Sequence, residues 1–439
     1  MKPGPVYLLF TLAVPAFSQY AGPAILSRGE APTGLTAPEI RFTPFVAISA
    51  VYDTGLAAVG VTPQGTLGTN SALGTALAWG VAGAHSWRRT RIGLNYTGEL
   101  DVYPHRSYFD AINQNVFLGL THQLSRRATF QLNTAAGMYS QLFFPVGLSQ
   151  TIPFDPTSTY IPTTDFYDNR TVYLSGTGAL TYRKTARLSF DFSGDGVIVA
   201  RRSAALYGTI GYGAGGDLQY RLAPHITVGA SYSYQHFDFT RIYGGTDVNQ
   251  VAATFGIRLT ARTEFSGYGG AALVENKFVS QVALDPAIAA LLGVSTASFV
   301  YYSSSWQPAF SGRLSRVFGK GVAYVGAARI ISPGNGLFLT STGTTFLGGY
   351  DYGGKWKRWS IGTFSSYIRA QSLGNITGYY GTAVVGVSVA RQLFRYTQFV
   401  MGFSARHYDS EQFLGYNRME YNAHVGLAFS PHEVALRIW

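Results

Sequence analysis

Apolar and polar residues alternate with a period of two along several stretches of this chain. Between residues 92 and 102, Ile, Leu, Tyr, Leu and Val fall on one face of an extended strand, and Asn, Thr, Glu and Asp fall on the other. The same alternation recurs at 188–195, 226–235, 251–260 and 418–429. Each segment is predicted to be a β-strand with one apolar and one polar side, whereas the alternation near 340–370 is less clean.

Short basic corners separate these strands. Their leading residues are Arg88, Arg126, Arg183, Arg221, Arg258, Arg316, Lys355 and Arg391. The corners recur about every 37 residues, with two intervals about 20 residues longer, which suits a repeat of two long strands, a loop and a tight turn. The chain is therefore predicted to be a series of hairpins, with short turns at one end and longer, variable loops at the other.

The two longer intervals contain clear insertions, at 143–166 and 277–298. In the second, Asp285, Pro286 and Gly293 occupy the positions that start and end a helix, so one short helix is predicted, either at the rim or folded into the barrel. In the first, Asp155, Asp165 and Asp168 do not have the spacing of a calcium loop, and solvated loop charge is the preferred interpretation.

The composition favours strands that cross a membrane. Only 13% of the residues are charged, against about a quarter in a typical soluble protein, and Gly (52), Tyr (30) and Phe (29) are abundant. The longest charge-free stretch, 286–312, is interrupted by Gly, Ser, Gln and Pro308, which makes it a poor membrane helix. Because lipid cannot satisfy backbone N–H and C=O groups, strands can span a membrane only as a closed barrel.

The predicted fold is all-β: a single transmembrane antiparallel up-and-down β-barrel of about 18 strands, with 16 as the alternative. Aromatic residues near predicted strand ends are expected to form girdles at the two membrane interfaces. They are Trp87, Tyr103, Tyr207, Tyr220, Trp306, Trp356, Trp359, Tyr396 and Tyr408. A soluble propeller is the less favoured alternative, because it would need four shorter strands in each repeat.

The termini divide the chain further. One early Lys, an apolar run at 6–14 and small residues before Gln19 indicate a secretory signal peptide over 1–18. Residues 19–40 are then a periplasmic N-terminal tail, 41–430 the barrel and 431–439 a C-terminal tail. Within that tail, Val434, Leu436 and Ile438 could pair as a short extra strand.

Over 41–430 the chain resembles a bacterial outer-membrane β-barrel of the porin-like kind, by its topology rather than by a motif. The resemblance implies an outer-membrane location in a Gram-negative-type bacterium and recognition of the C-terminal strand by the assembly machinery. Such proteins commonly end on an aromatic residue. Trp439 fits, but the residues before it match poorly, and Phe429 with its alternating neighbours matches better.

No enzyme, cofactor or metal site is expected from the motifs. The segment 211–216, GYGAGG, has the glycine spacing of a dinucleotide site, but a strand pattern follows it where such a site needs a helix. A row of small residues facing the lumen is the preferred interpretation. His122 and Ser140 lie at opposite ends of their predicted hairpin, which argues against a catalytic pair. The histidines show no metal-binding spacing.

Ionisable residues on the polar faces are the candidate pore lining. They are Glu99, Asp101, Asp191, Asp217, Arg258, Arg313, Arg406, Arg418 and Glu420. Opposed charges in a lumen select solutes by charge and size, so a porin-like channel for passive diffusion of small polar solutes is the first functional hypothesis. The alternative is a non-conducting structural or adhesion barrel that binds surface partners through its outer loops. A channel for hydrophobic compounds is disfavoured, because these inward faces supply no apolar site.

The basic corners are predicted to form a rim at the periplasmic side. Its members are Arg88, Arg89, Arg126, Arg127, Arg183, Lys184, Arg316, Lys355, Lys357 and Arg358. Basic residues beside a membrane favour anionic lipids, so outer-membrane lipids are expected partners of this rim. Despite the formal net charge of +11, nucleic acid is not an expected partner of an exported protein with no helix to present these residues. A homo-oligomer is allowed by the resemblance, although no pattern marks an interface.

Overall fold

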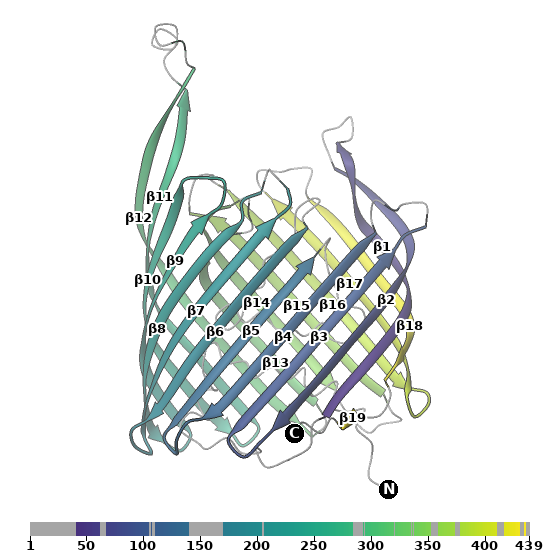
Figure 1. The fold of residues 1–439 in the computed structure, drawn as a ribbon, viewed down its shortest axis with the longest axis horizontal. Coiled ribbons are helices and arrows are strands. Elements are labelled where there is room, and N and C mark those ends of the chain that lie inside the picture. The colour runs from purple at the N-terminus through teal and green to yellow at the C-terminus, as the bar shows by residue number, and fades with distance from the viewer. Residues whose placement is uncertain are drawn as a thin grey trace.

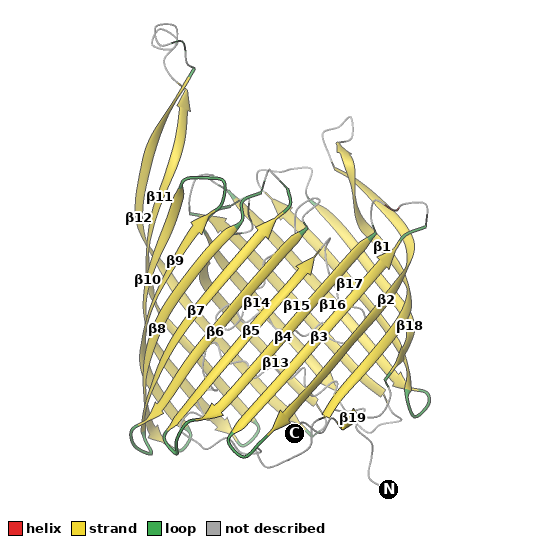
Figure 2. Ribbon diagram, viewed as in Figure 1, coloured by secondary structure: helices red, strands yellow, loops and turns green. Residues whose placement is uncertain are grey.

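Strands and the turns that join them make up the part of the chain that the structure describes (Figure 2). The computed structural model describes residues 41–61, 67–104, 107, 110–139, 170–203, 206–283, 293, 295–319, 321–334, 336, 338–352, 359–373, 378–410, 417–430 and 434–435. The strands are β1 (Arg41–Val61), β2 (Leu67–Ser86), β3 (Thr90–Val102), β4 (Ala111–Gln123), β5 (Ala128–Tyr139), β6 (Thr171–Arg183), β7 (Leu188–Arg201), β8 (Thr209–Ala223), β9 (Ile226–Phe239), β10 (Gly244–Thr260), β11 (Thr263–Ala283), β12 (Thr296–Phe318), β13 (Gly321–Ser332), β14 (Ser341–Tyr352), β15 (Trp359–Ser372), β16 (Tyr379–Gln392), β17 (Thr397–Ser410), β18 (Arg418–Phe429) and β19 (Val434–Ala435).

The strands form one antiparallel sheet that closes on itself (Figure 1). Each strand from β1 to β18 pairs with the next along the chain, and β18 pairs back onto β1, from Val46 with Phe429 to Asp53 with Asn422. The predicted fold class is confirmed: the protein is an up-and-down barrel of eighteen strands rather than sixteen. Closure pairs the first strand with the last and removes the open edge of the sheet.

The chain after β18 adds one further pairing. Val434 and Ala435, which form β19, pair with Phe42 and Arg41 of β1 beyond the end of β18. At the junction, the hydroxyl of Ser430 donates a hydrogen bond to the carbonyl of Pro44 (3.1 Å). β1 is therefore paired on this side over its first residues too, and the predicted extra pairing is present at Val434.

The two faces of the wall differ as the alternation predicts. On β1, Val46 and Ile48 are half exposed on the outside, while Ala47 and Ser49 between them are buried on the inside. The same pattern of large apolar side chains outside and small or polar ones inside continues around the wall. An outer apolar band of this kind is what a lipid bilayer requires of a barrel. In the described residues, no helix is long and apolar enough to cross a membrane.

The basic corners form tight turns for a local reason. In the β4–β5 turn, the hydroxyl of Ser125 accepts hydrogen bonds from the backbone N–H groups of Arg127 (3.1 Å) and Ala128 (3.0 Å). Thr185 does the same in the β6–β7 turn, where its hydroxyl accepts from the N–H of Leu188 (3.0 Å). A Ser or Thr that starts the turn satisfies backbone donors that the strands no longer pair, so the hairpin closes in few residues.

Two hairpins rise above the opposite end of the barrel, which we take as the extracellular end because its connections are longer (Figure 1). β11 and β12 stay paired as far as Ala283 with Thr296, whereas β13, on the other side of β12, ends at Ser332. β1 and β2 also extend upward, with register shifts after Asp53. The rest of the wall has strands of 12 to 17 residues.

Some of the predicted girdle residues lie on the outer face, as the prediction requires, whereas others lie inside, where the prediction is wrong. Trp306 and Tyr220 are exposed on the outer wall, and Trp359 lies beneath the guanidinium of Arg391 (5.0 Å). Tyr103 and Tyr408 are buried instead, and Tyr207 packs against a buried cluster inside the barrel. A tyrosine near a strand end fits either a membrane interface or a polar lumen, since its ring is apolar and its hydroxyl needs a partner.

Several predictions fall on residues that the structure does not describe. They concern the signal peptide and tail at 1–40, the loop with Asp155, Asp165 and Asp168, the helix at 285–294 apart from Gly293, Ser140, Trp356 and the last residues of the C-terminal tail.

Candidate functional site on the inner wall

All nine candidate pore-lining residues lie on the inward face of their strands. Directly paired residues of an antiparallel sheet point to the same side, and each of the nine alternates with outward apolar neighbours. They separate into three groups on different sectors of the wall. Glu99, Asp101, Arg406, Arg418 and Glu420 gather around the closure of the barrel, Asp191 and Asp217 lie on β7 and β8, and Arg258 and Arg313 lie on β10 and β12.

The first group is centred on Tyr408. Arg406 on β17 donates a hydrogen bond to the Tyr408 hydroxyl (2.7 Å), and the guanidinium of Arg418 on β18 lies 5.2 Å from the centre of the Tyr408 ring. Arg418 also forms an ion pair with Glu420 (2.6 Å), and both side chains are largely buried. Two guanidinium groups are thereby held on the inner wall close to the extracellular ends of β17 and β18.

Carboxylates continue this group across the closure. Asp53 on β1 accepts a hydrogen bond from the side-chain amide of Asn422 on β18 (3.0 Å). Asp101 and Glu99 follow on β3, where Glu99 is buried. Just beyond β3, burial raises the pKa of Tyr103 well above its ordinary value, and the charges of Asp53 and Asp101 act in the same direction. The sector is therefore positive at β17–β18 and negative at β1–β3.

The sequence missed Asp53 as a member of this group. Its stretch of β1, from Val51 to Thr54, alternates less clearly than the segments used to place the other residues. Asp53 lies two residues after Val51, which is buried on the inner face, so the two side chains point to the same side of β1. This spacing is the signal that could have identified Asp53.

The second group is acidic. Asp191 on β7 and Asp217 on β8 are directly paired in the sheet, and Asp191 accepts a hydrogen bond from the hydroxyl of Thr181 on β6. The glycine row predicted to face the lumen lies beside them. A Cβ on Gly213 would come within 2.7 Å of Asp195 Oδ1, so this glycine leaves space for a third inward carboxylate.

The third group alternates in charge across three strands. Arg258 on β10 is paired with Glu264 on β11, and Arg313 on β12 lies across from Ser266 in the same sector. The guanidinium of Arg313 is 4.9 Å from the ring centre of Tyr324 on β13. Glu264 was not among the sequence candidates, because its side of β11 contains mostly small and apolar residues.

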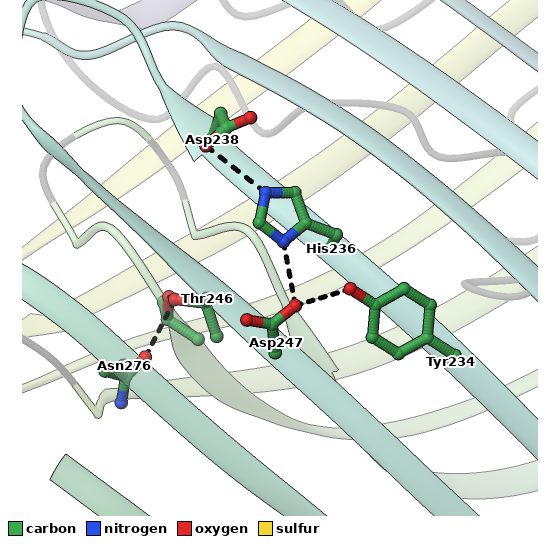
Figure 3. Close-up of polar contacts among 7 residues, drawn as sticks. Tyr234, His236, Asp238, Thr246, Asp247 and Asn276 are labelled. Carbon is green, nitrogen blue, oxygen red and sulfur yellow. Dashed lines mark hydrogen bonds and ion pairs between the residues drawn. The ribbon is translucent and has the colours of Figure 1, made fainter. Parts of the chain in front are cut away.

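A segment between β13 and β14 folds into the barrel. The hydroxyl groups of Thr340 and Thr246 of β10 lie 2.6 Å apart, and Thr246 donates a hydrogen bond to Asn276 on β11 (2.8 Å; Figure 3). The carbonyl of Gly336 accepts a hydrogen bond from the N–H of Tyr207 (2.9 Å), which lies beyond β7. The segment thus reaches the wall several strands away from its own hairpin, and its described residues include Phe338, Leu339 and Thr340, all fully buried.

Glycine permits this path. Gly336 has a φ of +91°, which other residues rarely adopt, and a Cβ there would lie 2.6 Å from Nε of the buried Arg201. Gly334, with a φ of +65°, gives the segment a second left-handed position. The periodicity of the strands does not predict this segment, and the apolar Leu-Phe-Leu run inside a loop is its signal in the sequence.

The expectation that the inner face has no apolar surface is wrong. Leu339 joins a buried cluster that is made mainly of inward side chains of β9 to β12 and includes Phe237, Phe239, Val274 and Phe278. A second cluster, on β5 to β7, contains Tyr139 and Tyr173 with stacked rings 5.6 Å apart. The side chains in these clusters are buried against one another. They therefore form a packed apolar part of the inner face, away from the charged sector.

On the outer face, one histidine lies between two carboxylates. His236 of β9 faces outward, and its Nδ1 lies 2.8 Å from Asp247 of β10 while its Nε2 lies 3.3 Å from Asp238 (Figure 3). Since both ring nitrogens face carboxylates, neither is available to activate a nucleophile. His122 contacts the hydroxyl of Thr90 (2.7 Å). In the described part of the chain, no three His, Asp or Glu residues are grouped so as to hold a metal ion.

The basic corners lie together at the end of the barrel with short turns. Arg88, Arg89, Arg126, Arg127 and Lys184 are exposed in these turns, and Arg183 donates a hydrogen bond to the carbonyl of Arg126 (3.2 Å). Arg316 stacks on Phe318 (5.2 Å). Lys355, Lys357 and Arg358 are outside the described residues. Guanidinium groups over outward aromatic rings suit the level of lipid headgroups.

We expect the R88Q/R89Q/R126Q/R127Q variant to assemble several-fold more slowly, because it loses four charges that attract anionic lipid surfaces. Folding into vesicles with and without anionic lipid, followed by the heat-dependent shift of the barrel on gels, measures this effect. A variant that folds at the normal rate in anionic vesicles would show that the rim has no such role.

The fold and the inner wall together define an antiparallel β-barrel of eighteen strands with an apolar outer band and ionisable residues inside, which is the architecture of transmembrane β-barrels. No family model and no curated protein matches this sequence. Among solved structures, the chain is similar to OpdQ of Pseudomonas aeruginosa, with 11% identity over 89% of this chain and 97% of that one and a TM-score of 0.41.

Two further solved structures show the same degree of similarity. OccK5 (OpdH) of Pseudomonas aeruginosa has 10% identity over 91% of this chain and 99% of that one, with a TM-score of 0.41. The ferric citrate transporter FecA has 10% identity over 85% of this chain and 60% of that one, with a TM-score of 0.40. Similarity this low carries no information on the solute, selectivity or assembly of this protein.

Proposed function

We propose that the protein is an outer-membrane channel through which small polar solutes diffuse passively. The observation that carries this proposal is the inner wall at the extracellular half, where Arg406 and Arg418 on one side of the closure adjoin Asp53, Glu99 and Asp101 on the other. Ionisable groups inside a lipid-embedded protein are costly unless they face water or one another. Arranged with separated signs, they set a field across the lumen.

The segment that carries Gly336 and Leu339 supplies the size limit in this proposal. It is fixed at Thr246 on β10 and at Tyr207 beyond β7, so it narrows the lumen from the side opposite the charged sector. A solute would pass between a packed apolar surface and a row of charges. Barrels of 16 to 18 strands are wide enough to leave an aqueous channel when no domain fills them.

Swelling of liposomes that contain the purified barrel tests passive diffusion directly. Small sugars and amino acids should enter at rates that fall steeply with solute size, because the inward segment limits the cross-section. Liposomes with a correctly folded barrel that swell no faster than protein-free liposomes would reject a diffusion channel and favour the alternative below.

The alternative function is a non-conducting barrel that binds surface partners, and one observation favours it. The β11–β12 hairpin continues above the wall with exposed side chains on both faces, among them Phe299, Tyr301 and Tyr302 (Figure 1). Exposed aromatic groups on a projecting ribbon often mark a binding surface. Truncating this hairpin should abolish binding to surface partners if adhesion is the function, and should leave solute diffusion intact if the protein is a channel.

A further inference from the structure

Two arginines lie in one row on the outer wall near its extracellular end, on strands separated by β14. Arg329 of β13 is paired with Thr344 of β14, and Thr344 is paired with Arg369 of β15. Directly paired residues share a face of the sheet, and Arg329 is paired on its other side with Phe310, which is exposed on the outside. The row Arg329–Thr344–Arg369 therefore faces away from the lumen.

The height of this row follows from the strand ends. Arg329 and Arg369 lie shortly before the extracellular ends of β13 and β15, at Ser332 and Ser372, and Thr344 lies shortly after the start of β14 at Ser341. Below the row, the outer face becomes apolar again, with Val325 and Phe346 half exposed. The row is thus placed at the level of the headgroups of the outer leaflet.

Neither guanidinium has an anionic partner in the described part of the protein. Arg329 and Arg369 form no ion pair with a described carboxylate, and Nε of Arg329 is buried without a hydrogen-bond acceptor there. Arg369 lies over the ring of Tyr379 (4.2 Å), whose hydroxyl donates to Asp409 (3.4 Å). Two like charges on neighbouring positions of the outer face repel each other, so an anion at this site would stabilise the pair.

The outer face of the β9–β11 sector is mostly acidic at this height. At the corresponding height on β9 and β10, His236 lies between Asp238 and Asp247 (Figure 3), and the outer face of β11 adds Glu275 and one cation, Lys277. An anion at the outer leaflet is therefore attracted to β13–β15 and repelled by β9–β11.

We propose that the outer face of β13–β15 binds the phosphate group of an anionic lipid of the outer leaflet. The two guanidinium groups belong to strands about 10 Å apart, and the side chain of Arg369, which now lies over Tyr379, is long enough to turn toward a phosphate that Arg329 also contacts. The hydroxyl of Thr344 lies between them as a further donor.

The surface below the row suits an acyl chain. Gly348 of β14 and Ser365 of β15 are paired on the outer face, directly below the stacked rings of Phe346 and Tyr367 (6.4 Å between centres). A Cβ added at Gly348 would meet only ordinary contact distances, so no side chain covers the backbone of β14 at this position. The phosphate and the chain of one lipid would thus occupy adjacent parts of the same outer face.

Binding of lipid A to the full-length barrel in detergent, followed by native mass spectrometry, tests this proposal. The R329Q/R369Q variant should lose at least about tenfold in affinity, since each charge-assisted hydrogen bond contributes about 1.5–3 kcal/mol. The matched control is K277Q, which removes an outward charge at a similar height where the ammonium lies over the rings of Tyr243 and Tyr302. K277Q should bind lipid A as the wild type does.

Wild-type protein gives an independent measurement if the double variant does not fold. Dephosphorylated lipid A should bind at least about tenfold more weakly than lipid A, and millimolar inorganic phosphate should not displace the lipid, because the acyl track contributes. Equal binding of the two lipids, equal binding by R329Q/R369Q, or full displacement by inorganic phosphate would each overturn the proposal. These readouts do not depend on solute diffusion, so they are separate from the test of the channel.

Discussion

Shortening the connection between β13 and β14 is expected to raise the single-channel conductance about two-fold or more, because it removes the segment that narrows the lumen. Ser332 and Ser341 are directly paired at the ends of this hairpin, so replacing residues 333–340 with an Asn-Gly turn closes it without strain. The contacts of Thr340 with Thr246 and of Gly336 with Tyr207 disappear with the segment. Recordings from planar bilayers measure the change.

A matched control shortens the connection between Ala283 and Thr296, which are paired at the far end of the projecting β11–β12 hairpin. That hairpin rises above the wall (Figure 1), so its shortening should leave the conductance unchanged. If both variants conduct as the wild type does, the segment between β13 and β14 does not limit the pore.

Removing two inward carboxylates should shift the ion selectivity toward anions. In the E99Q/D101N variant, Arg406 and Arg418 remain on the neighbouring sector, so the field across the lumen becomes more positive. The ratio of cation to anion permeability should fall at least roughly five-fold, since each charge acting across water contributes about 1 kcal/mol and two are removed. The reversal potential in a salt gradient measures this ratio.

The control for selectivity is E275Q. Glu275 is exposed on the outer face of β11, so its charge lies outside the lumen, and its removal should leave the reversal potential unchanged. An unchanged reversal potential in E99Q/D101N as well would mean that these two carboxylates have a structural role only.

The wall of the barrel could be predicted from the sequence because lipid imposes a simple rule on each strand. In a strand such as β18, the residues that face lipid are apolar, and the residues that alternate with them face the lumen. This gives a strong period of two in the sequence, from which the strands can be counted. The turns were equally visible, because Ser125 and Thr185 start corners whose geometry depends only on nearby residues.

The narrow part of the lumen could not be predicted in this way. Its position depends on contacts between residues far apart in the chain, such as Thr340 with Thr246. A loop has no periodic pattern that would show whether it folds into the lumen or away from it. Tyr408 was misplaced for a related reason. A tyrosine near a strand end suits a membrane interface, but Tyr408 lies two residues after Arg406 and therefore faces inward as Arg406 does. Only the pairing of β17 with β18 brings the guanidinium of Arg418 over the ring of Tyr408.

Planar bilayer recording of the wild-type protein tests the channel most directly. A folded, heat-modifiable barrel should insert in discrete steps of constant conductance, each step one open lumen. Its selectivity should reflect the inward charges around Arg418 and Asp101. A bilayer that stays silent after insertion of the folded barrel would contradict the channel and leave the protein as a closed structural or binding barrel.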